Sequence, residues 1–168
     1  MTQKRRSKKR VTPSRIRIRP VASARATATV RRLFREYAAA VGEPLCFENF
    51  GEELAHLPEP YVAPAGSLLL ARVGRTAVGA VGTRRWSPTI CEMKRLYVRP
   101  PFRGRGVGLA LAEAILGEAR RLGYARMRLD SLESMKVARA MYRRLGFREI
   151  PPYLPPSTPK THYMELRL

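Results

Sequence analysis

Residues that could bind an anion are concentrated between Leu96 and Gly108. A short aromatic and β-branched run ends there at a Pro-Pro pair, and an apolar helical pattern follows, so we predict a strand, a tight loop and a helix N-terminus. Glycines alternate with arginines in the run Arg103-Gly104-Arg105-Gly106-Val107-Gly108. Such a loop can direct backbone N–H groups, the positive end of a helix dipole and guanidinium groups at one anion. The pattern therefore predicts a phosphate or pyrophosphate site, and with it a phosphorylated cofactor.

The charge of the chain is strongly positive. Its 168 residues include 33 Lys and Arg against 13 Asp and Glu, a net charge of +20, and residues 1–19 carry nine basic side chains and no acid. We predict a disordered basic tail over residues 1–13 and a single domain over residues 14–168, because single cores usually hold about 100–200 residues. A chain this positive attracts polyanions, so nonspecific nucleic acid contact through the tail is one expectation. A solvated leader without a role is the other.

The sequence contains no pattern typical of a metal site or of a membrane-spanning helix. Cys46 and Cys91 are the only cysteines, and neither has a zinc-type spacing with another Cys or His. No apolar run approaches the ~20 residues that a membrane-spanning helix needs, and the basic N-terminus has no apolar segment behind it. We therefore expect a cytoplasmic protein with no metal site and no contact with a membrane.

Hydrophobic periodicity predicts a mixed α/β fold without internal repeats. The elements follow the order strand, two helices, three strands, then helix, strand, helix and two strands. The predicted strands are 15–19, 67–73, 76–85, 90–99, 125–129, 147–150 and 163–168. The first helix starts after Ser23 and ends at Gly42, and the other helices cover 47–57, 107–122 and a segment capped by Ser134 that ends at Gly146, with an apolar face of Val137, Ala138, Met141, Tyr142 and Leu145.

The connection from strand 90–99 through a helix to strand 125–129 predicts a parallel pair inside the mixed sheet, joined by a right-handed crossover. Ligands of such sheets bind outside the carboxyl ends of the strands. The glycine loop follows strand 90–99 directly, so it lies at that edge.

At this point the residues resemble a family. The element order together with Arg103-x-x-Gly106-x-Gly108 resembles the acetyl-CoA-binding loop of the GNAT (Gcn5-related) N-acetyltransferases. The run Ala138-x-x-x-Tyr142-x-x-x-Gly146-Phe147 resembles that family's C-terminal motif, and the likeness extends from Arg15 to Leu168. The resemblance implies a mostly antiparallel central sheet flanked by helices, with a splayed parallel strand pair that holds the cofactor.

The resemblance also implies a donor and its contacts. Acetyl-CoA would lie between strands 90–99 and 125–129, with its pantetheine bonded to backbone groups of Leu96, Tyr97 and Val98. The N–H groups of the glycine loop would hold its pyrophosphate, through Arg103, Gly104, Arg105, Gly106, Val107 and Gly108. The alternative for this loop is a plain strand-to-helix turn. Where the family often has a cofactor-contacting asparagine this chain has Met135, so we expect that contact to be absent or to be replaced by Ser134 or Ser131.

Two residues stand where the family has catalytic groups. Glu92 matches the position of a general-base glutamate, and Tyr142 matches the tyrosine that faces the coenzyme sulfur and protonates it. The alternatives are a structural ion pair of Glu92 with Arg84 or Arg85, and a core tyrosine. Cys91 neighbours Glu92 and so points to the opposite face of the strand, which favours direct transfer in a ternary complex. We expect the isolated His56 and His162 at the surface, with His162 as a secondary candidate for the base.

The acceptor is less defined than the donor. An N-acetyltransferase would act on a primary amine of a small molecule, a peptide or a protein. We expect the acceptor site between the first two helices, loop 58–66 and segment 151–162, which supply Glu48, Asn49, Glu52, Glu53 and Tyr153. The alternative function is a nucleic-acid- or ribosome-associated binding protein that retains the acetyltransferase fold. A homodimer is a further expectation.

Overall fold

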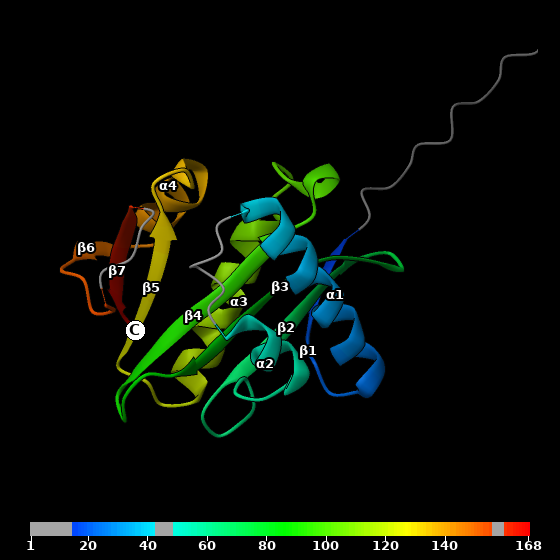
Figure 1. The fold of residues 1–168 in the computed structure, drawn as a ribbon, viewed down its shortest axis with the longest axis horizontal. Helices are drawn as coiled ribbons and strands as arrows, with labels where there is room; N and C mark the ends of the chain where they lie inside the picture. Colours follow the sequence, from blue (N-terminus) through cyan, green and yellow to red (C-terminus); the bar gives the residue numbers. More distant parts are fainter. Residues whose placement is uncertain (1–14, 43–48, 156–159) are drawn as a thin grey trace, which may run out of the picture.

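The computed structural model describes residues 15–42, 49–155 and 160–168, which form a seven-stranded sheet with helices on both faces (Figure 1). The strand order is β1-β2-β3-β4-β5-β7-β6. The elements are β1 (Ile16–Pro20), α1 (Ala24–Val41), α2 (Phe50–Ala55), β2 (Ser67–Val73), β3 (Thr76–Arg85), β4 (Ile90–Val98), the 3-10 turn η2 (Pro100–Phe102), α3 (Val107–Arg121), β5 (Arg126–Leu132), α4 (Lys136–Arg144), β6 (Arg148–Ile150) and β7 (Thr161–Arg167).

Each face of the sheet has its own core. On one face, α1 and α2 bury Leu33, Phe34 and Leu54 against residues of β2 and β3. On the other face, α3 packs on β2, β3 and β4 and buries Leu111 and Ile115, and α4 adds residues to the same cluster. A strand that is covered on both faces has few polar positions, which explains why β2 and β3 are buried along most of their length.

The one parallel pair of the sheet forms between β4 and β5 and is short. It runs over Ile90↔Arg126, Cys91↔Met127 and Glu92↔Arg128, and the two strands then part. All other pairs are antiparallel. This arrangement confirms the expected fold class, a mostly antiparallel sheet flanked by helices with one splayed parallel pair.

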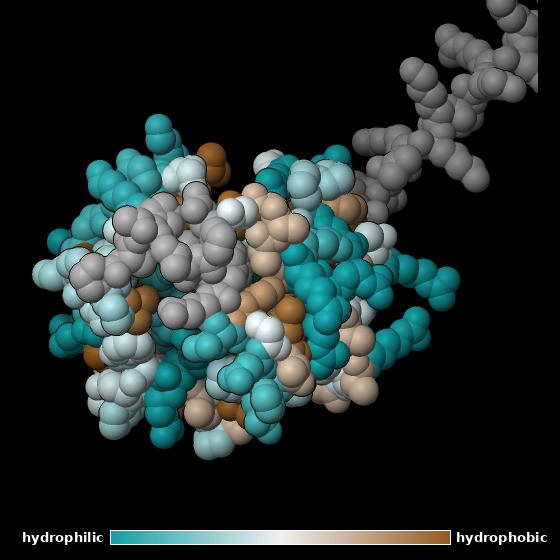
Figure 2. Space-filling model, in the orientation of Figure 1, coloured by the Kyte–Doolittle hydropathy of each residue, from teal (hydrophilic) through white to brown (hydrophobic). Residues whose placement is uncertain are grey.

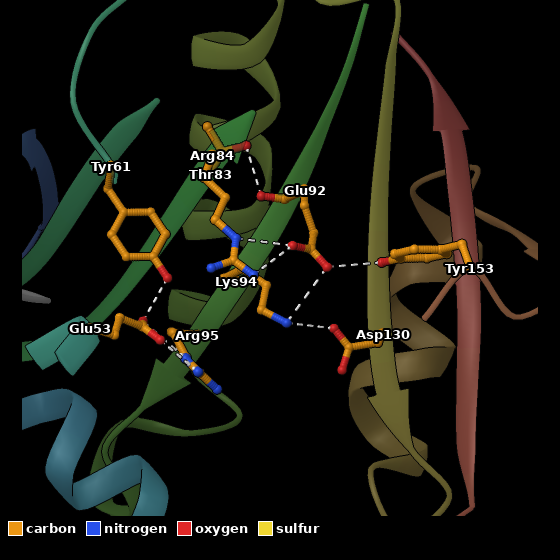
Figure 3. A network of polar contacts seen from close by, with 9 residues as sticks. All are labelled: Glu53, Tyr61, Thr83, Arg84, Glu92, Lys94, Arg95, Asp130 and Tyr153. Carbon is orange, nitrogen blue, oxygen red and sulfur yellow. Dashed lines mark hydrogen bonds and ion pairs between the residues drawn. The ribbon is translucent and has the colours of Figure 1, made fainter. Parts of the chain in front are cut away.

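A β-bulge lies in β4 just beyond the point where the strands part. The register with β3 shifts between Ala80 and Gly82, and Arg95 has a φ of 60°, a left-handed conformation that costs a non-glycine residue about 1–3 kcal/mol. Because the bulge interrupts the alternation of side chains, the consecutive residues Lys94 and Arg95 both contact groups on the α2 face of the sheet (Figure 3).

The start of α4 differs from the prediction. Its N-cap is Met135 with no side-chain capping bond, so Ser134 does not cap the helix. The buried guanidinium of Arg139 instead holds the connection from β5, because its Nη1 donates to the carbonyl oxygens of Leu132 and Glu133. Val137 was also misplaced: it is 87% exposed, because the core packs against Ala138, Met141, Tyr142 and Leu145.

Other boundaries moved by a few residues. β5 runs to Leu132, three residues beyond the predicted end, because β7 pairs with it along that whole length. β7 begins at Thr161 for the same reason. The predicted start of the second helix at Phe47 lies outside the described residues, as do Cys46, Glu48 and the tail 1–13. In the part of the chain that the structure describes, no helix has the length and apolarity to cross a bilayer.

Candidate active site

A cleft opens where β4 and β5 part. Both strands contribute to its walls, and residues of α1 and α4 also line it. Because the β4–β5 ladder ends at Glu92↔Arg128, the β4 backbone beyond that point has no partner strand on this side. Unpaired strand groups of this kind can bind an extended ligand as an added strand. The lining includes Lys94, Arg95, Leu96, Asp130, Ser131, Met135 and Tyr142.

The three predicted backbone contacts follow one another along β4. Leu96 lines the cleft. The side chain of Tyr97 is buried on the α1 side, where its ring lies 5.7 Å from the ring of Tyr37. The carbonyl oxygen of Val98 accepts a hydrogen bond of 2.8 Å from Nε of Arg103, so this strand end is tied to the glycine loop.

The glycine loop leads directly into α3. Gly104 and Gly106 have φ values of 70° and 81°, a region where a Cβ would be strained, and Gly106 is the N-cap of the helix. The first backbone N–H groups of α3, next to this loop, therefore have no hydrogen-bond acceptor within the helix. Arg103 and Arg105 are exposed, and within the described residues neither forms an ion pair with a carboxylate. The loop thus presents positive charge and N–H donors beside the cleft, and Val107 and Gly108 begin the helix.

Two buried hydroxyl groups line the cleft on its α4 side. Tyr142 is buried, lines the cleft, and packs its ring edge-on against Phe147. Burial raises the pKa of Tyr142, and the nearby Tyr37 and Asp130 add to the effect. Its hydroxyl therefore stays protonated near neutral pH and can donate a proton into the cleft.

Ser131 supplies the second hydroxyl. Its Oγ is buried and has no hydrogen-bond partner in the described part of the chain. A buried hydroxyl without a partner is costly, so an unpartnered one in a cleft fits a ligand that completes the bond. Ser134 is exposed and is not among the cleft-lining residues, so of the two serines considered, Ser131 is the one that faces the cleft.

Glu92 lies in the middle of a polar network on the α2 face (Figure 3). Its side chain is only 1% exposed. Arg84 approaches its Oε2 at 3.1 Å, and the Tyr153 hydroxyl donates to its Oε1 at 3.1 Å. Nζ of Lys94 lies 3.6 Å from the same Oε1. The predicted pairing with Arg84 is therefore present, and donors surround this carboxylate.

Asp130 is a functional candidate that the sequence analysis missed. It lines the cleft, its side chain is 27% exposed, and its Oδ1 lies 2.8 Å from Nζ of Lys94. Burial opposes its ionisation, but the charge and hydrogen bond of Lys94 outweigh that effect and lower the pKa of Asp130. The only sequence signal was one carboxylate in an otherwise apolar strand end, 12 residues before Tyr142.

A second ion pair joins α2 to the bulge of β4. Two nitrogens of the Arg95 guanidinium, Nε and Nη2, donate to the carboxylate of Glu53 at 3.2 and 2.7 Å. The Tyr61 hydroxyl donates to the same carboxylate at 2.6 Å. The side chains of Arg95 and Glu53 are both nearly buried. Glu53 is thus a structural partner of the cleft wall, whereas Glu52 on the same helix is exposed.

The two histidines lie apart from the cleft lining. His56 is exposed and bonds the carbonyl oxygen of Glu52. His162 is half-buried on β7 and contacts the carboxylates of Glu133 and Glu149. Among the described residues, no group of three or more His, Cys, Asp or Glu has a metal-binding arrangement.

Comparison with known proteins decides the family. Residues 28–147 match the family model of the acetyltransferase (GNAT) family. This chain belongs to that family. It is 37% identical to an uncharacterized N-acetyltransferase of Schizosaccharomyces pombe over 158 residues, which covers 93% of this chain and 97% of the relative.

Solved structures share the GNAT fold of this chain. An acetyltransferase from Streptococcus agalactiae superposes with a TM-score of 0.76 at 19% identity, and covers 91% of this chain and 98% of its own. A GNAT acetyltransferase from Elizabethkingia anophelis with acetyl-CoA bound gives a TM-score of 0.66 at 17% identity, with coverage of 91% and 98%. The expected family, the class of acetyl-CoA-dependent acetyltransferase and the donor are confirmed.

The residues of this GNAT chain fit acetyl-CoA. The glycine loop offers N–H groups and two exposed arginines to a pyrophosphate. The unpaired edge of β4 and the unpartnered Ser131 hydroxyl offer hydrogen bonds to the amide groups of pantetheine. When bound, the cofactor supplies an activated acetyl thioester.

Proposed function

We propose that this protein transfers the acetyl group of acetyl-CoA directly to a primary amine, in a ternary complex. The observation that carries this proposal is the cleft, which combines a protonated hydroxyl from Tyr142 with an ionised carboxylate from Asp130. Attack by an amine on a thioester needs both groups, one to take a proton from the amine and one to give a proton to the leaving thiolate.

The buried thiol of Cys91 supports direct transfer. Cys91 belongs to the core on the α3 face of the sheet, and burial raises the pKa of its thiol to about 11. A protonated, enclosed thiol is a poor nucleophile. An acetyl-cysteine intermediate at this residue therefore has no support, and the amine itself is the attacking group.

The base belongs to the carboxylates of the network in Figure 3. Glu92 has the position that the family resemblance suggested, but Arg84, Lys94 and Tyr153 contact its oxygens. Asp130 lines the cleft and is partly open to solvent. We therefore assign the proton-accepting role to Asp130, with Glu92 and Lys94 holding its surroundings in place.

The acceptor is a primary amine of a small molecule, a peptide or a protein. It would reach the cleft from the face that carries α1 and α2, since the network residues point to that side (Figure 3). Tyr153, on the segment after β6, borders the same network through Glu92. Arg84, Lys94 and Arg95 form ion pairs with the described carboxylates there. The site therefore favours an acceptor that carries no charged group besides its reacting amine.

Donor binding is tested first, by calorimetric titration and thermal shift with acetyl-CoA. A ligand at 100 times its Kd stabilises a fold by about 2.7 kcal/mol. Gly106→Glu places a side chain and a negative charge in the loop and should abolish the response, because Gly106 has a φ of 81°. Gly117→Glu is the matched control, since it adds the same charge on the same helix at an open, exposed position. No response to acetyl-CoA in the unaltered protein would contradict the proposal.

Turnover is tested with a panel of primary amines. We expect Tyr142→Phe to lower kcat about 100-fold with little change in the KM for acetyl-CoA, because a positioned general acid contributes about 10²–10⁴-fold. Because its pKa is raised, the Tyr142 hydroxyl stays protonated above pH 10, the ordinary pKa of tyrosine being about 10. Loss of this proton should therefore not lower kcat at any pH below about 10. Unchanged kcat in Tyr142→Phe would leave the tyrosine a core residue.

A further inference from the structure

Lys94 carries a primary amine into the cleft. Its side chain is 11% exposed, and its Nζ lies 2.8 Å from Oδ1 of Asp130 and 3.6 Å from Oε1 of Glu92 (Figure 3). The last paired residues of β4 and β5 are Glu92 and Arg128, so Lys94 and Asp130 are the next residues of the two strands on that face. The amine thus lies at the point where the strands part.

The cleft therefore already contains each protein group that an acetyl transfer requires. Lys94 offers an amine, Asp130 a carboxylate in direct contact with it, and Tyr142 a protonated hydroxyl, and all three line the same cavity. The other lysines in the described residues, Lys136 and Lys160, are exposed at the surface and do not line it. The amine of Lys94 thus contacts the same carboxylate that an external acceptor amine would approach.

We infer that Lys94 is itself an acceptor and that the enzyme acetylates its Nζ from acetyl-CoA bound in the cleft. This inference rests on the proposed function, because it uses the same donor, carboxylate and hydroxyl. The ammonium first gives a proton to Asp130, and the lone pair of Nζ attacks the thioester carbonyl carbon. The C–S bond breaks, its electron pair leaves with sulfur, and Tyr142 protonates the thiolate. The nitrogen then gives up its second proton, which returns to the Tyr142 oxygen and restores the hydroxyl. The products are Nζ-acetyl-lysine, free CoA and one proton, which passes from Asp130 to solvent.

The ion pair sets the rate of this reaction. Nζ of Lys94 lies 2.8 Å from Oδ1 of Asp130 and 3.6 Å from Oε1 of Glu92, and it must leave these contacts to attack the thioester. Self-acetylation is therefore slower than turnover with a good external amine, and it proceeds when no acceptor competes for the cleft. Since the amine belongs to the same protein molecule that binds the acetyl-CoA, the rate constant of labelling does not depend on the concentration of the protein.

Acetylation changes the site that performs it. The acetylated side chain has no charge, so Asp130 loses the cation that lowers its pKa. The cleft then gains a net negative charge and a bulkier wall. We expect the modified enzyme to have a different acceptor preference from the unmodified one, with cationic amines favoured.

The test uses the full chain with acetyl-CoA that carries a ¹³C-labelled acetyl group, so that acetylation acquired during expression is distinguished by mass. Acetylation of Lys94 blocks tryptic cleavage there, and digestion then yields peptide 86–95 intact. We expect one heavy acetyl group on that peptide, formed with a rate constant independent of protein concentration. Tyr142→Phe should slow the labelling about 100-fold and Gly106→Glu should abolish it.

Matched variants separate this reaction from nonspecific acetylation by the thioester. Lys94→Arg should lose the heavy label, whereas Lys160→Arg, which alters an exposed lysine, should keep it. Absence of label on Lys94 in a protein that binds acetyl-CoA and acetylates an external amine overturns the inference and leaves the proposed function intact. Equal labelling of Lys94 and Lys160, unaffected by Gly106→Glu, also overturns it. Absence of acetyl-CoA binding overturns both.

Discussion

Glu92 and Asp130, the two carboxylates at the cleft, differ in their burial and in the number of their polar contacts. Glu92 is enclosed, and its oxygens are shared among Arg84, Lys94 and Tyr153. Asp130 has one close cation and a surface open to the cleft. A general base has to reach the proton that it takes, so position favours Asp130 even though both groups can accept a proton.

Paired substitutions at these two carboxylates give the first prediction at the residue scale. Glu92→Gln should lower the free energy of unfolding by about 2 kcal/mol, because a buried ion pair loses one partner and Arg84 keeps partial access to water. Asp130→Asn should instead lower kcat about 100-fold, with a smaller effect on stability. Chemical denaturation and steady-state kinetics on both variants check this. A large loss of kcat in a well-folded Glu92→Gln, with Asp130→Asn active, would make Glu92 the base.

At the scale of elements, the ion pair of Glu53 and Arg95 connects α2 to the bulge of β4. The bulge needs Arg95 in a left-handed conformation that ordinary residues avoid, and the bidentate contact with Glu53 holds it there. The bulge in turn shapes the wall of the cleft beside Leu96. A short helix on the surface thus supports the geometry of a strand beneath it.

Removal of this contact tests its role. Glu53→Gln should cost about 3 kcal/mol, because the nearly buried guanidinium of Arg95 loses the negative charge of Glu53. Glu52→Gln is the matched control on the same helix and should change stability by less than about 0.5 kcal/mol, since that side chain is exposed. Urea denaturation of both variants at neutral pH measures the difference. Equal stability of the two would mean that Arg95 finds another partner at no cost.

The same pair gives a dependence on pH. Burial opposes ionisation of Glu53, but its bonds to Arg95 prevail and hold the pKa of Glu53 below its ordinary value of about 4.3. A lowered pKa in the folded state stabilises the protein above the ordinary value, and this stabilisation is lost as pH falls through the lowered one. The stability difference between the native chain and Glu53→Gln should therefore shrink at acid pH.

At the scale of the whole molecule, positive charge dominates. The net charge of +20 includes six basic side chains in residues 1–13. The comparisons give the alternative of a nucleic-acid-binding protein no support, and contact of the tail with polyanions and a homodimer stay predictions.

Deletion of residues 1–13 tests the tail. We expect binding of a short oligonucleotide to weaken and its dependence on salt to become less steep, because fewer counterions are released. Affinity for acetyl-CoA should not change, since the cleft and the glycine loop lie in other segments. Fluorescence anisotropy at several salt concentrations and calorimetry measure the two. A loss of acetyl-CoA binding on deletion would give the tail a part in the site.

The sequence by itself determined the order of the elements, the glycine loop and the position of Tyr142. These features depend on residues close together in the chain: glycines with positive φ, prolines that end a strand, and apolar residues at helical spacing. Predictions from the sequence were wrong where periodicity and packing disagree. Val137 has the spacing of the apolar helix face, but no other part of the fold covers it.

The tertiary structure alone decided which groups meet in the cleft. Lys94 and Asp130 are 36 residues apart, and Glu53 and Arg95 are 42 apart. Their contacts depend on the β4–β5 register and on one bulge that turns two consecutive side chains to the same face. Strict alternation along a strand would send Arg95 to the other face, and no short pattern in the sequence marks the residue at which alternation fails.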